Sequence, residues 1–131
     1  MRSKLVVFAL SMLITCTSCI AAELSAGSKA EIDALLDRLG ASGCQFNRNG
    51  TWYGSAKAKS HLARKLDYLL DKKLVESPEQ FIVLAGTKSS QSGEDYLVKC
   101  GNEAAVPSAT WLTEALRELR AKNPQHGAEK K

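Results

Sequence analysis

The placement of the four cysteines limits the fold more than any other feature of this 131-residue sequence. Cys16 and Cys19 belong to an N-terminal stretch that we expect to be removed. Cys44 and Cys100 then remain, and they can form only one intramolecular bridge. Closing a loop of about 57 residues removes unfolded-state entropy worth roughly 4 kcal/mol in the chain-entropy model. No C-x-x-C spacing survives in the mature chain, so we interpret the bridge as structural and not as a redox pair.

The first 22 residues have the three-part layout of a secretory signal peptide. Met1–Lys4 is short and positively charged, Leu5–Ile14 is almost entirely apolar, and small residues lead to Ala21 and Ala22. The apolar run is about half as long as the ~20 residues that cross a membrane, which excludes a permanent transmembrane helix. We therefore predict a signal peptide over residues 1–22, cut after Ala22 or Ala21, and a periplasmic location.

A lipid anchor is the alternative for this stretch, because bacterial lipoproteins are cut before a cysteine that then carries lipid. Thr15 precedes Cys16 and Ser18 precedes Cys19, where Gly or Ala is usual. We interpret both cysteines as small residues of a discarded peptide and keep a lipid-anchored envelope protein as the alternative.

The mature chain is nearly balanced in charge. Losing Arg2 and Lys4 with the leader leaves 16 basic and 14 acidic side chains in residues 23–131. Nucleic-acid-binding proteins depend on a strong and clustered basic excess, because phosphate neutralisation supplies most of their affinity. We therefore expect no nucleic-acid partner.

A first helix is predicted over residues 29–40. Ser28 and Glu31 have the spacing of a capping box, and Gly40 is the residue type that commonly ends a helix in the left-handed conformation. Four apolar residues at three- and four-residue steps form one stripe on this helix. They are Ile32, Leu35, Leu36 and Leu39.

The strongest local signal is Asn49-Gly50 between two β-prone runs, because a primed two-residue turn needs a positive φ at both positions. This turn makes residues 44–53 a hairpin in which Phe46 opposes Tyr53. Strand alternation then divides the side chains between two faces. One face carries Cys44, Phe46 and Tyr53, and the other carries Gln45, Asn47 and Trp52.

Two further helices follow. Residues 55–73 contain no Pro or Gly and place five apolar side chains on one side. A short helix begins at the capping box Ser77-Pro78-Glu79-Gln80, where proline takes the first helical position and its missing amide costs nothing. Residues 81–85 are apolar on every side, so we predict that this helix is buried. The stripe of the long helix is Ala58, Leu62, Leu66, Leu69 and Leu70.

A serine-rich loop over residues 87–94 precedes a strand over residues 95–100. Tyr96, Val98 and Cys100 share one face of that strand. Pairing it with the hairpin brings Cys100 beside Cys44 and completes a three-stranded sheet, which is stable on helices where a lone hairpin would not be.

The last helix is predicted to be capped by Ser108, and residues 123–131 to form a disordered C-terminal tail. The helix has a broad apolar stripe made of Trp111, Leu112, Ala115, Leu116 and Leu119. The predicted fold is therefore α+β over residues 23–122. It combines a three-stranded antiparallel sheet (hairpin 44–53 plus strand 95–100), about four helices and one disulfide.

The first group of candidate binding residues lies along one flank of the long helix. His61, Lys65 and Tyr68 recur at steps of four and three residues. The stripe is typical of a solvated helix face, with Lys stems and the Tyr ring covering the edge of the core. The functional interpretation is a face that binds an anionic group, with Ser90 and Ser92 of the loop nearby.

A second candidate group is Arg48 and Trp52 near the hairpin tip. Trp and Arg dominate binding hot spots, so this tip is suited to anchoring a ligand or a protein. A single Trp near a strand end also often packs on a helix, and here it would cover the first helix from the far face of the sheet. Both interpretations stay open.

Catalysis is the weaker hypothesis. His61 with Ser89, Ser90 or Ser92 would form a nucleophile and its base, as in a small cell-envelope hydrolase, but no orienting acid is identifiable. Serine-rich loops usually form turns whose hydroxyls bond nearby amides, so we assign no catalytic residue. His61 and His126 are the mature chain's only histidines, and we expect no metal and no cofactor.

Several short motifs occur together between residues 31 and 120. They are Ser42-Gly43-Cys44, Arg48-Asn49-Gly50, Trp52-Tyr53, His61-Leu62, Ser89-Ser90, Tyr96-Leu97-Val98 and Trp111-Leu112. In this combination the chain resembles the YfeK-like family of small exported bacterial proteins of unknown function. The resemblance implies an exported α+β domain with Cys44 and Cys100 bridged, and it implies no activity.

These observations favour a small periplasmic protein that acts as a non-catalytic binding, accessory or inhibitor-type module. The expected partner is an unknown periplasmic protein or an anionic cell-envelope ligand. The hydrolase and the lipid-anchored protein are the alternatives.

Overall fold

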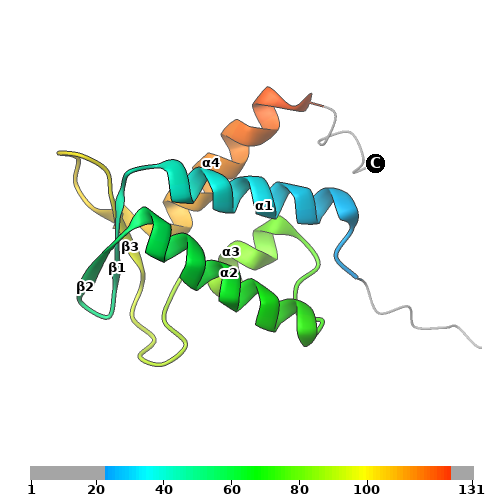
Figure 1. Cartoon of the computed structure of the whole chain (residues 1–131), viewed down its shortest axis with the longest axis horizontal. Helices are drawn as coiled ribbons and strands as arrows, with labels where there is room; N and C mark the ends of the chain where they lie inside the picture. The colour runs from blue at the N-terminus through cyan, green and yellow to red at the C-terminus, as the bar shows by residue number, and fades with distance from the viewer. Residues whose placement is uncertain (1–22, 125–131) are drawn as a thin grey trace, which may run out of the picture.

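The computed structural model describes residues 23–124 of the chain. The predicted signal peptide and lipid-anchor cysteines lie outside these residues, as do residues 125–131 of the predicted tail. The elements follow one another in an α+β order (Figure 1). They are α1 (Ala26–Ala41), β1 (Gln45–Arg48), β2 (Thr51–Gly54), α2 (Ser55–Asp71), α3 (Pro78–Ala85), β3 (Leu97–Lys99), β4 (Val106–Pro107) and α4 (Ser108–Lys122).

The hairpin forms as the Asn-Gly signal predicts. Asn49 and Gly50 have φ angles of 52° and 81°, which is the left-handed geometry that a primed turn requires. The β1 and β2 strands pair antiparallel with Phe46 opposite Tyr53, which confirms the predicted register. Phe46 is buried under the sheet, whereas Trp52 on the opposite face is 41% exposed. Trp52 therefore does not have the buried position that packing on α1 would give it.

The sheet has four antiparallel strands in the order β2-β1-β3-β4, and the prediction of three was wrong. The missed strand is Val106–Pro107, which pairs with Val98 and Leu97. Two residues, one of them a proline without an amide, give no alternation and do not indicate a strand from sequence. The predicted strand 95–100 is shorter in the structure, because Asp95 forms only an isolated bridge with Lys88.

The disulfide joins Cys44 to Cys100, as predicted. Cys44 precedes β1 and Cys100 follows β3, and these two strands pair antiparallel with Phe46 opposite Val98. The bridge therefore fastens the central strand pair of the sheet at one end.

The first helix begins three residues earlier than predicted. Ser25, not Ser28, is the N-cap, and its hydroxyl accepts the amide of Ser28. Glu31 is therefore free of a capping role and reaches Arg120 of α4 instead. Gly40 lies inside the helix, and the left-handed glycine that follows the helix is Gly43, with a φ of 67°.

Of the two middle helices, α2 has the predicted buried face, whereas the prediction for α3 was partly wrong. The long helix α2 buries Ala58, Leu62, Leu66 and Leu69, as expected. In α3, Ser77 caps the amide of Gln80 and Pro78 takes the first position, which confirms the predicted start. The helix is not buried on every side, however.

Val83 and Leu84 of α3 are 67% and 45% exposed. Composition alone cannot orient an eight-residue helix, because packing buries only the face that meets α1, α2 and α4. The other face of α3 therefore leaves apolar side chains at the surface.

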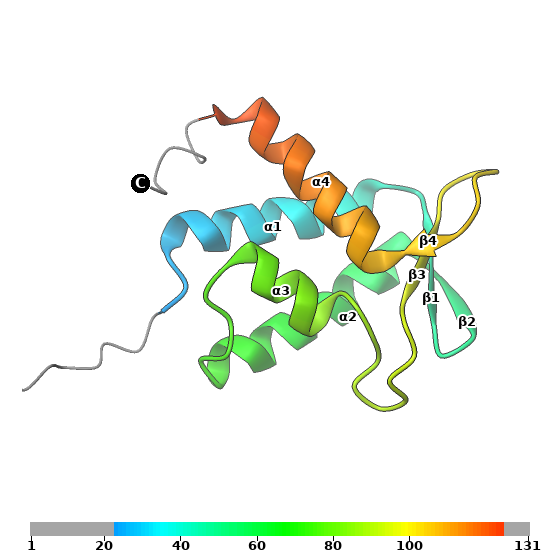
Figure 2. The ribbon, with the colours of Figure 1, turned by 180° about the vertical axis from the view of Figure 1, so that it is seen from behind.

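The last helix begins at Ser108, but Pro107 is its N-cap and no side chain caps it. The predicted capping role of Ser108 was therefore wrong. The four-stranded sheet lies at one end of the molecule, and the helices extend away from it (Figures 1 and 2). The α1 and α2 helices lie side by side, and α4 starts directly from the sheet edge at β4. This arrangement places the start of α2 and the start of α4 beside the same sheet.

Candidate functional site

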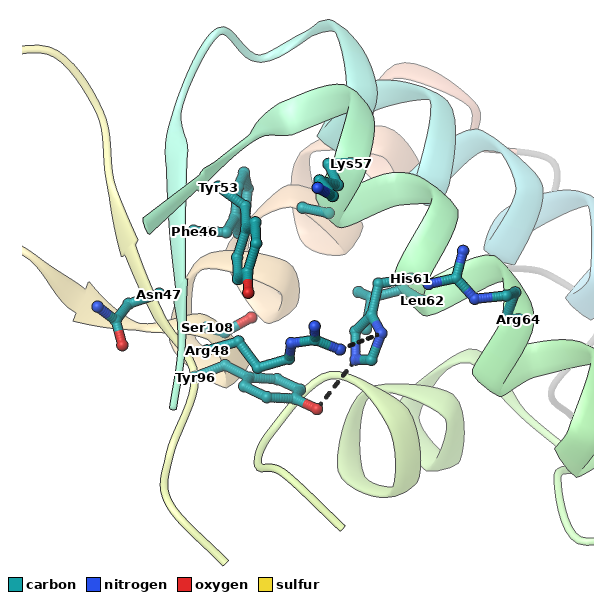
Figure 3. A pocket seen from close by; sticks show the side chains of 11 residues that line it. Phe46, Asn47, Arg48, Tyr53, Lys57, His61, Leu62, Arg64, Tyr96 and Ser108 are labelled. Carbon is teal, nitrogen blue, oxygen red and sulfur yellow. Dashed lines mark hydrogen bonds between the residues drawn. The ribbon is translucent and has the colours of Figure 1, made fainter. Parts of the chain in front are cut away.

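A cavity of about 60 Å³ lies where the hairpin meets the first half of α2 (Figure 3). One water molecule needs ~10–15 Å³ on the same volume scale, so the cavity has room for a small group such as a carboxylate but not for a whole large ligand. Residues of β1, β2, α2 and α4 contribute to its walls, together with Tyr96, which directly precedes β3. The lining is Phe46, Asn47, Arg48, Tyr53, Lys57, Ala58, His61, Leu62, Arg64, Tyr96 and Ser108.

His61 lies at the centre of a hydrogen-bond chain in this cavity. Its Nδ1 is 2.9 Å from Nη1 of Arg48, and its Nε2 is 3.1 Å from the hydroxyl of Tyr96. A guanidinium has only donors, so Nδ1 accepts from Arg48 and the ring proton is on Nε2. Nε2–H therefore donates to the oxygen of Tyr96. Both ring nitrogens are used by groups from the sheet side of the cavity.

The pKa of His61 is lowered to about 4, first by burial and then by the positive charges of Arg48, Lys65 and Arg64. The hydrogen-bond chain agrees with this direction, because a second ring proton on Nδ1 would face the guanidinium of Arg48. His61 is therefore a neutral imidazole at pH 7.

Lys65 lies one helical turn beyond His61 and also reaches Tyr96. Its Nζ is 3.4 Å from the Tyr96 hydroxyl, 5.1 Å from the centre of the Tyr96 ring and 3.2 Å from the carbonyl oxygen of Lys88. Burial and the charge of Arg48 lower the pKa of Lys65, and burial raises the pKa of Tyr96. Because Tyr96 accepts from both His61 and Lys65, its own hydroxyl proton remains available to a ligand.

Tyr53 forms the opposite wall of the cavity and faces two cations. The guanidinium carbon of Arg48 is 5.2 Å from the centre of its ring, and Nζ of Lys57 is 5.4 Å from it. The Arg48 guanidinium beside the Tyr53 hydroxyl is also the main cause of the lowered pKa of that group. Arg48 thus links the two aromatic walls and the imidazole.

The cations of this site have no carboxylate partners. Every ion pair among residues 23–124 involves other basic side chains, and no acidic residue lines the cavity. Clustered positive charge in a partly buried, water-poor site repels itself and is stabilised by an anion. The four basic residues that line or adjoin the cavity are Arg48, Lys57, Arg64 and Lys65.

A shallow groove continues from the cavity along α2 and shares His61 and Arg64 with it. Of the residues predicted for the site, Lys65, Tyr68 and Ser90 line this groove. Tyr68 is 60% exposed, and the exposed Leu84 of α3 lies on the other wall. The predicted α2 flank is therefore the wall of a groove that ends at the cavity.

The three other residues predicted for the site do not lie in the groove. Ser92 lies in the serine loop, and its hydroxyl donates to Oδ1 of Asn49 at the hairpin turn, at 2.5 Å. Trp52 is on the outer face of β2 and lines neither the cavity nor the groove. Arg48, which the sequence placed with Trp52 at the hairpin tip, instead turns toward His61.

The serine loop does not supply a nucleophile to His61 within residues 23–124. Ser89 is buried, and its hydroxyl accepts the amides of Gln91 and Ser92, both at 3.3 Å. Ser92 is bound to the hairpin turn, and both nitrogens of His61 are taken by Arg48 and Tyr96. The loop hydroxyls thus stabilise turns, which is their usual role in such sequences.

With this geometry established, the chain was compared with known proteins. A family model described as a family of unknown function, DUF5329, matches residues 26–120, which run from the first residue of α1 to Arg120 in α4. The chain belongs to DUF5329. The match brings no activity, and it does not test the resemblance to the YfeK-like family. No curated protein and no solved structure matches the chain.

Sequence reasoning missed three contributors to the site of this DUF5329 domain. Tyr53 and Tyr96 were predicted for the inner sheet face, but not as partners of the α2 flank. Ser108 was predicted only as a cap. The available signal was that Tyr53 and Tyr96 share the face on which α2 packs, while β4, which positions Ser108, gave no signal.

Residues 23–124 of this DUF5329 domain contain neither a cluster of metal ligands nor a membrane-spanning helix. Within residues 23–124, no three His, Cys, Asp or Glu side chains are grouped as metal ligands would be. In the same part of the chain, every helix is too short or too polar to cross a lipid bilayer.

Proposed function

We propose that this protein is an exported, non-catalytic binding module that holds an anionic group of a cell-envelope ligand in the cavity beside His61. The observation that carries the proposal is the Arg48–His61–Tyr96–Lys65 hydrogen-bond chain in a site without carboxylates. An inhibitor-type protein that accepts an acidic side chain of its target is one version of the same function.

The hydrogen-bond inventory of the site favours an acceptor. Arg48 and Lys65 can only donate, and Tyr96 already accepts from two groups and has its own proton to give. The single imidazole acceptor, Nδ1 of His61, is occupied by Arg48. A ligand group that only accepts, such as a carboxylate, therefore complements the site, whereas an ammonium group does not.

Export is supported by the predicted signal peptide over residues 1–22 and agrees with a disulfide between Cys44 and Cys100. Disulfides persist in the periplasm and are rare in the reducing cytosol. In that compartment, cell-wall fragments with free carboxylates and acidic protein surfaces are both accessible partners.

The hydrolase alternative receives less support from the geometry. A serine nucleophile needs a base within about 3.2 Å and a third group that orients the base. Among the described residues, His61 forms no hydrogen bond with a serine, and its partner at Nδ1 is a cation instead of a carboxylate. We therefore do not assign a hydrolytic reaction to this site.

The experiment is a binding titration of the mature, oxidised protein with N-acetylmuramic acid, a cell-wall sugar with a carboxylate. Its methyl ester is the neutral control. Chemical-shift changes at His61 and Tyr96 are expected with the acid and absent with the ester. A peptide containing two glutamates tests the protein-partner version with the same readout.

Variants assign the binding to the cavity. Arg48→Gln is expected to raise the Kd at least about tenfold, because it removes a charge-assisted hydrogen bond. Lys29→Gln, on an exposed ion pair of α1, is the matched control and should leave the Kd unchanged. Equal Kd values for the protein, Arg48→Gln and Lys29→Gln would contradict the proposal.

A further inference from the structure

The starts of α2 and α4, whose N-caps are Gly54 and Pro107, have no capping side chain, unlike the starts of α1 and α3. Ser25 and Ser77 each accept an amide of the first turn in those helices. Pro107 is the N-cap of α4 and has no side-chain oxygen to accept one. The first turn of α4 therefore has no capping side chain. A helix start without a cap has amides that lack intrahelical partners, and it has a partial positive charge.

Ser108, the first residue of α4, is a separate observation at the same place. The residue is 2% exposed and lines the cavity. Its amide donates to the carbonyl oxygen of Tyr96 at 2.8 Å, which fixes its position. No side-chain polar atom among residues 23–124 is both fully enclosed and without a hydrogen-bond partner. The Ser108 hydroxyl, which bonds no residue of this part of the chain, is therefore open to the cavity that it lines, where a ligand can reach it.

Arg48 supplies a positive charge to the same cavity. One of its nitrogens, Nη1, is committed to His61, and the remaining N–H donors of the guanidinium are not engaged by any carboxylate among the described residues. In the view of Figure 3 the Ser108 hydroxyl lies between the side chains of Arg48 and Tyr53, and all three residues line the cavity. The guanidinium of Arg48 in β1 and the hydroxyl of Ser108 at the start of α4 thus both line the cavity.

We propose that the cavity seats a carboxylate between the Arg48 guanidinium and the Ser108 hydroxyl, at the amino end of α4. This inference rests on the proposed function and names the ligand's charged group and its exact neighbours. A guanidinium edge matches the two oxygens of a carboxylate, and a neutral hydroxyl completes the contact.

A carboxylate fits this seat better than a phosphate. The cavity measures about 60 Å³, and Phe46 and Leu62 form apolar walls that cannot hydrogen-bond. A phosphate dianion has more oxygens and more charge to desolvate than these donors can satisfy. The ligand is therefore a small carboxylic acid, or a larger molecule that inserts a carboxylate and leaves its remainder at the cavity mouth.

The test uses sodium acetate and inorganic phosphate as probes, with N-acetylmuramic acid as the larger carboxylate. Binding to the mature protein is followed by chemical shifts of Tyr53, His61 and Tyr96. Acetate and N-acetylmuramic acid are expected to compete for one site, and phosphate to bind at least about tenfold more weakly. Equal or tighter binding of phosphate would overturn the assignment of a carboxylate.

Ser108→Ala tests the seat, because it removes only the hydroxyl and keeps a good helix former. A roughly tenfold rise in the Kd of both carboxylates is expected, with no fall in Tm, since a hydroxyl that opens to the cavity and bonds no other residue adds no hydrogen bond to the fold. Ser60→Ala, on the exposed face of α2, where the hydroxyl donates only to the carbonyl oxygen of Ala56, is the matched control and should change neither quantity.

The outcomes separate this inference from the proposed function. If Arg48→Gln abolishes binding while Ser108→Ala leaves it unchanged, the anion binds elsewhere on the cationic site, and the seat is wrong. If neither variant changes the Kd, both proposals fail. A Tm that falls in Ser108→Ala would show that the hydroxyl has a structural partner and would also overturn the seat.

Discussion

Arginines at two ends of the molecule have opposite electrostatic environments. Arg120 of α4 forms ion pairs with Glu31 at 2.7 Å and Glu79 at 2.5 Å. Arg48 of β1 has an imidazole and an aromatic ring as neighbours and no carboxylate among residues 23–124. The comparison shows that positive charge is paired within the fold at one end, whereas at the other it has no carboxylate partner among residues 23–124.

The Arg120 end is a junction of three helices. Glu31 belongs to α1, Glu79 to α3 and Arg120 to α4, and the side chain of Glu31 is only 12% exposed. The two carboxylates raise the pKa of Arg120 further above its already high value. The Arg48 end, in contrast, is organised by strand pairing and by the disulfide, so its cations are not needed to hold the elements together.

The largest expected effect concerns what holds the cavity end. Replacing both cysteines, as in Cys44→Ser with Cys100→Ser, should lower the free energy of unfolding by about 4 kcal/mol, because a loop of about 57 residues is released. Urea denaturation with a tryptophan signal measures this change. The oxidised protein with added reductant is the control, and a loss below about 1 kcal/mol would mean that the sheet end does not depend on its bridge.

The next effect tests the helical junction. Arg120→Ala should cost about 3 kcal/mol, because it leaves the largely buried carboxylate of Glu31 without its partner. Arg117→Ala, which removes an exposed ion pair with Glu114, is the matched control and should cost less than about 0.5 kcal/mol.

Arg48→Ala belongs to the same experiment and is expected to cost no more than about 1 kcal/mol, the worth of its hydrogen bond. If it destabilises the protein as much as Arg120→Ala does, the cavity cations are structural. The contrast between the two ends would then be lost.

A smaller effect is expected from pH. The folded pKa of His61 is about 4, below its usual 6.5, so protonation favours the unfolded chain. Stability is therefore complete above pH 6.5 and falls as the pH drops from 6.5 to 4, by roughly 1 to 2 kcal/mol after allowance for solvent screening. His61→Gln should flatten this part of the curve in denaturation measurements from pH 7 to 4. An unchanged slope would show that His61 is already solvated.

The smallest effect is a shift in the titration of His61 itself. The charge of Arg64 is the weakest of the causes that lower its pKa. Arg64→Gln should therefore raise the pKa of His61 by a few tenths, about 0.2 to 0.5, as a screened charge would. An NMR titration of the imidazole detects this change. Arg117→Gln is the matched control, and a drop in the pKa of His61 in Arg64→Gln would contradict the electrostatic account.

Local chemistry predicted the parts of the fold that depend on near neighbours in the sequence. Asn49-Gly50 set the hairpin register, and Ser77-Pro78 set the start of α3, because turns and caps are decided within a few residues. The β4 strand is different: its two residues form a strand only because Val98 and Leu97 of β3 lie beside them. Long-range pairing of that kind has no local signature.

The candidate site shows the same division. The spacing along α2 nominated His61 and Lys65 together, because helical periodicity is a local property. The approach of Arg48 to His61 depends on how the hairpin packs on α2, so the sequence grouped Arg48 with Trp52 instead. Ser108 was missed for the same reason, since its burial follows from β4 and not from its helix position.

Pro107 has a consequence for how this protein behaves in a crowded compartment. It occupies one of the two positions of the outermost strand β4 and has no amide to donate. A strand from a neighbouring molecule that approaches this side meets carbonyl oxygens but at most one amide donor, that of Val106. Proline therefore makes β4 a poor template for the addition of another strand, at the edge of the sheet that lies farthest from β2.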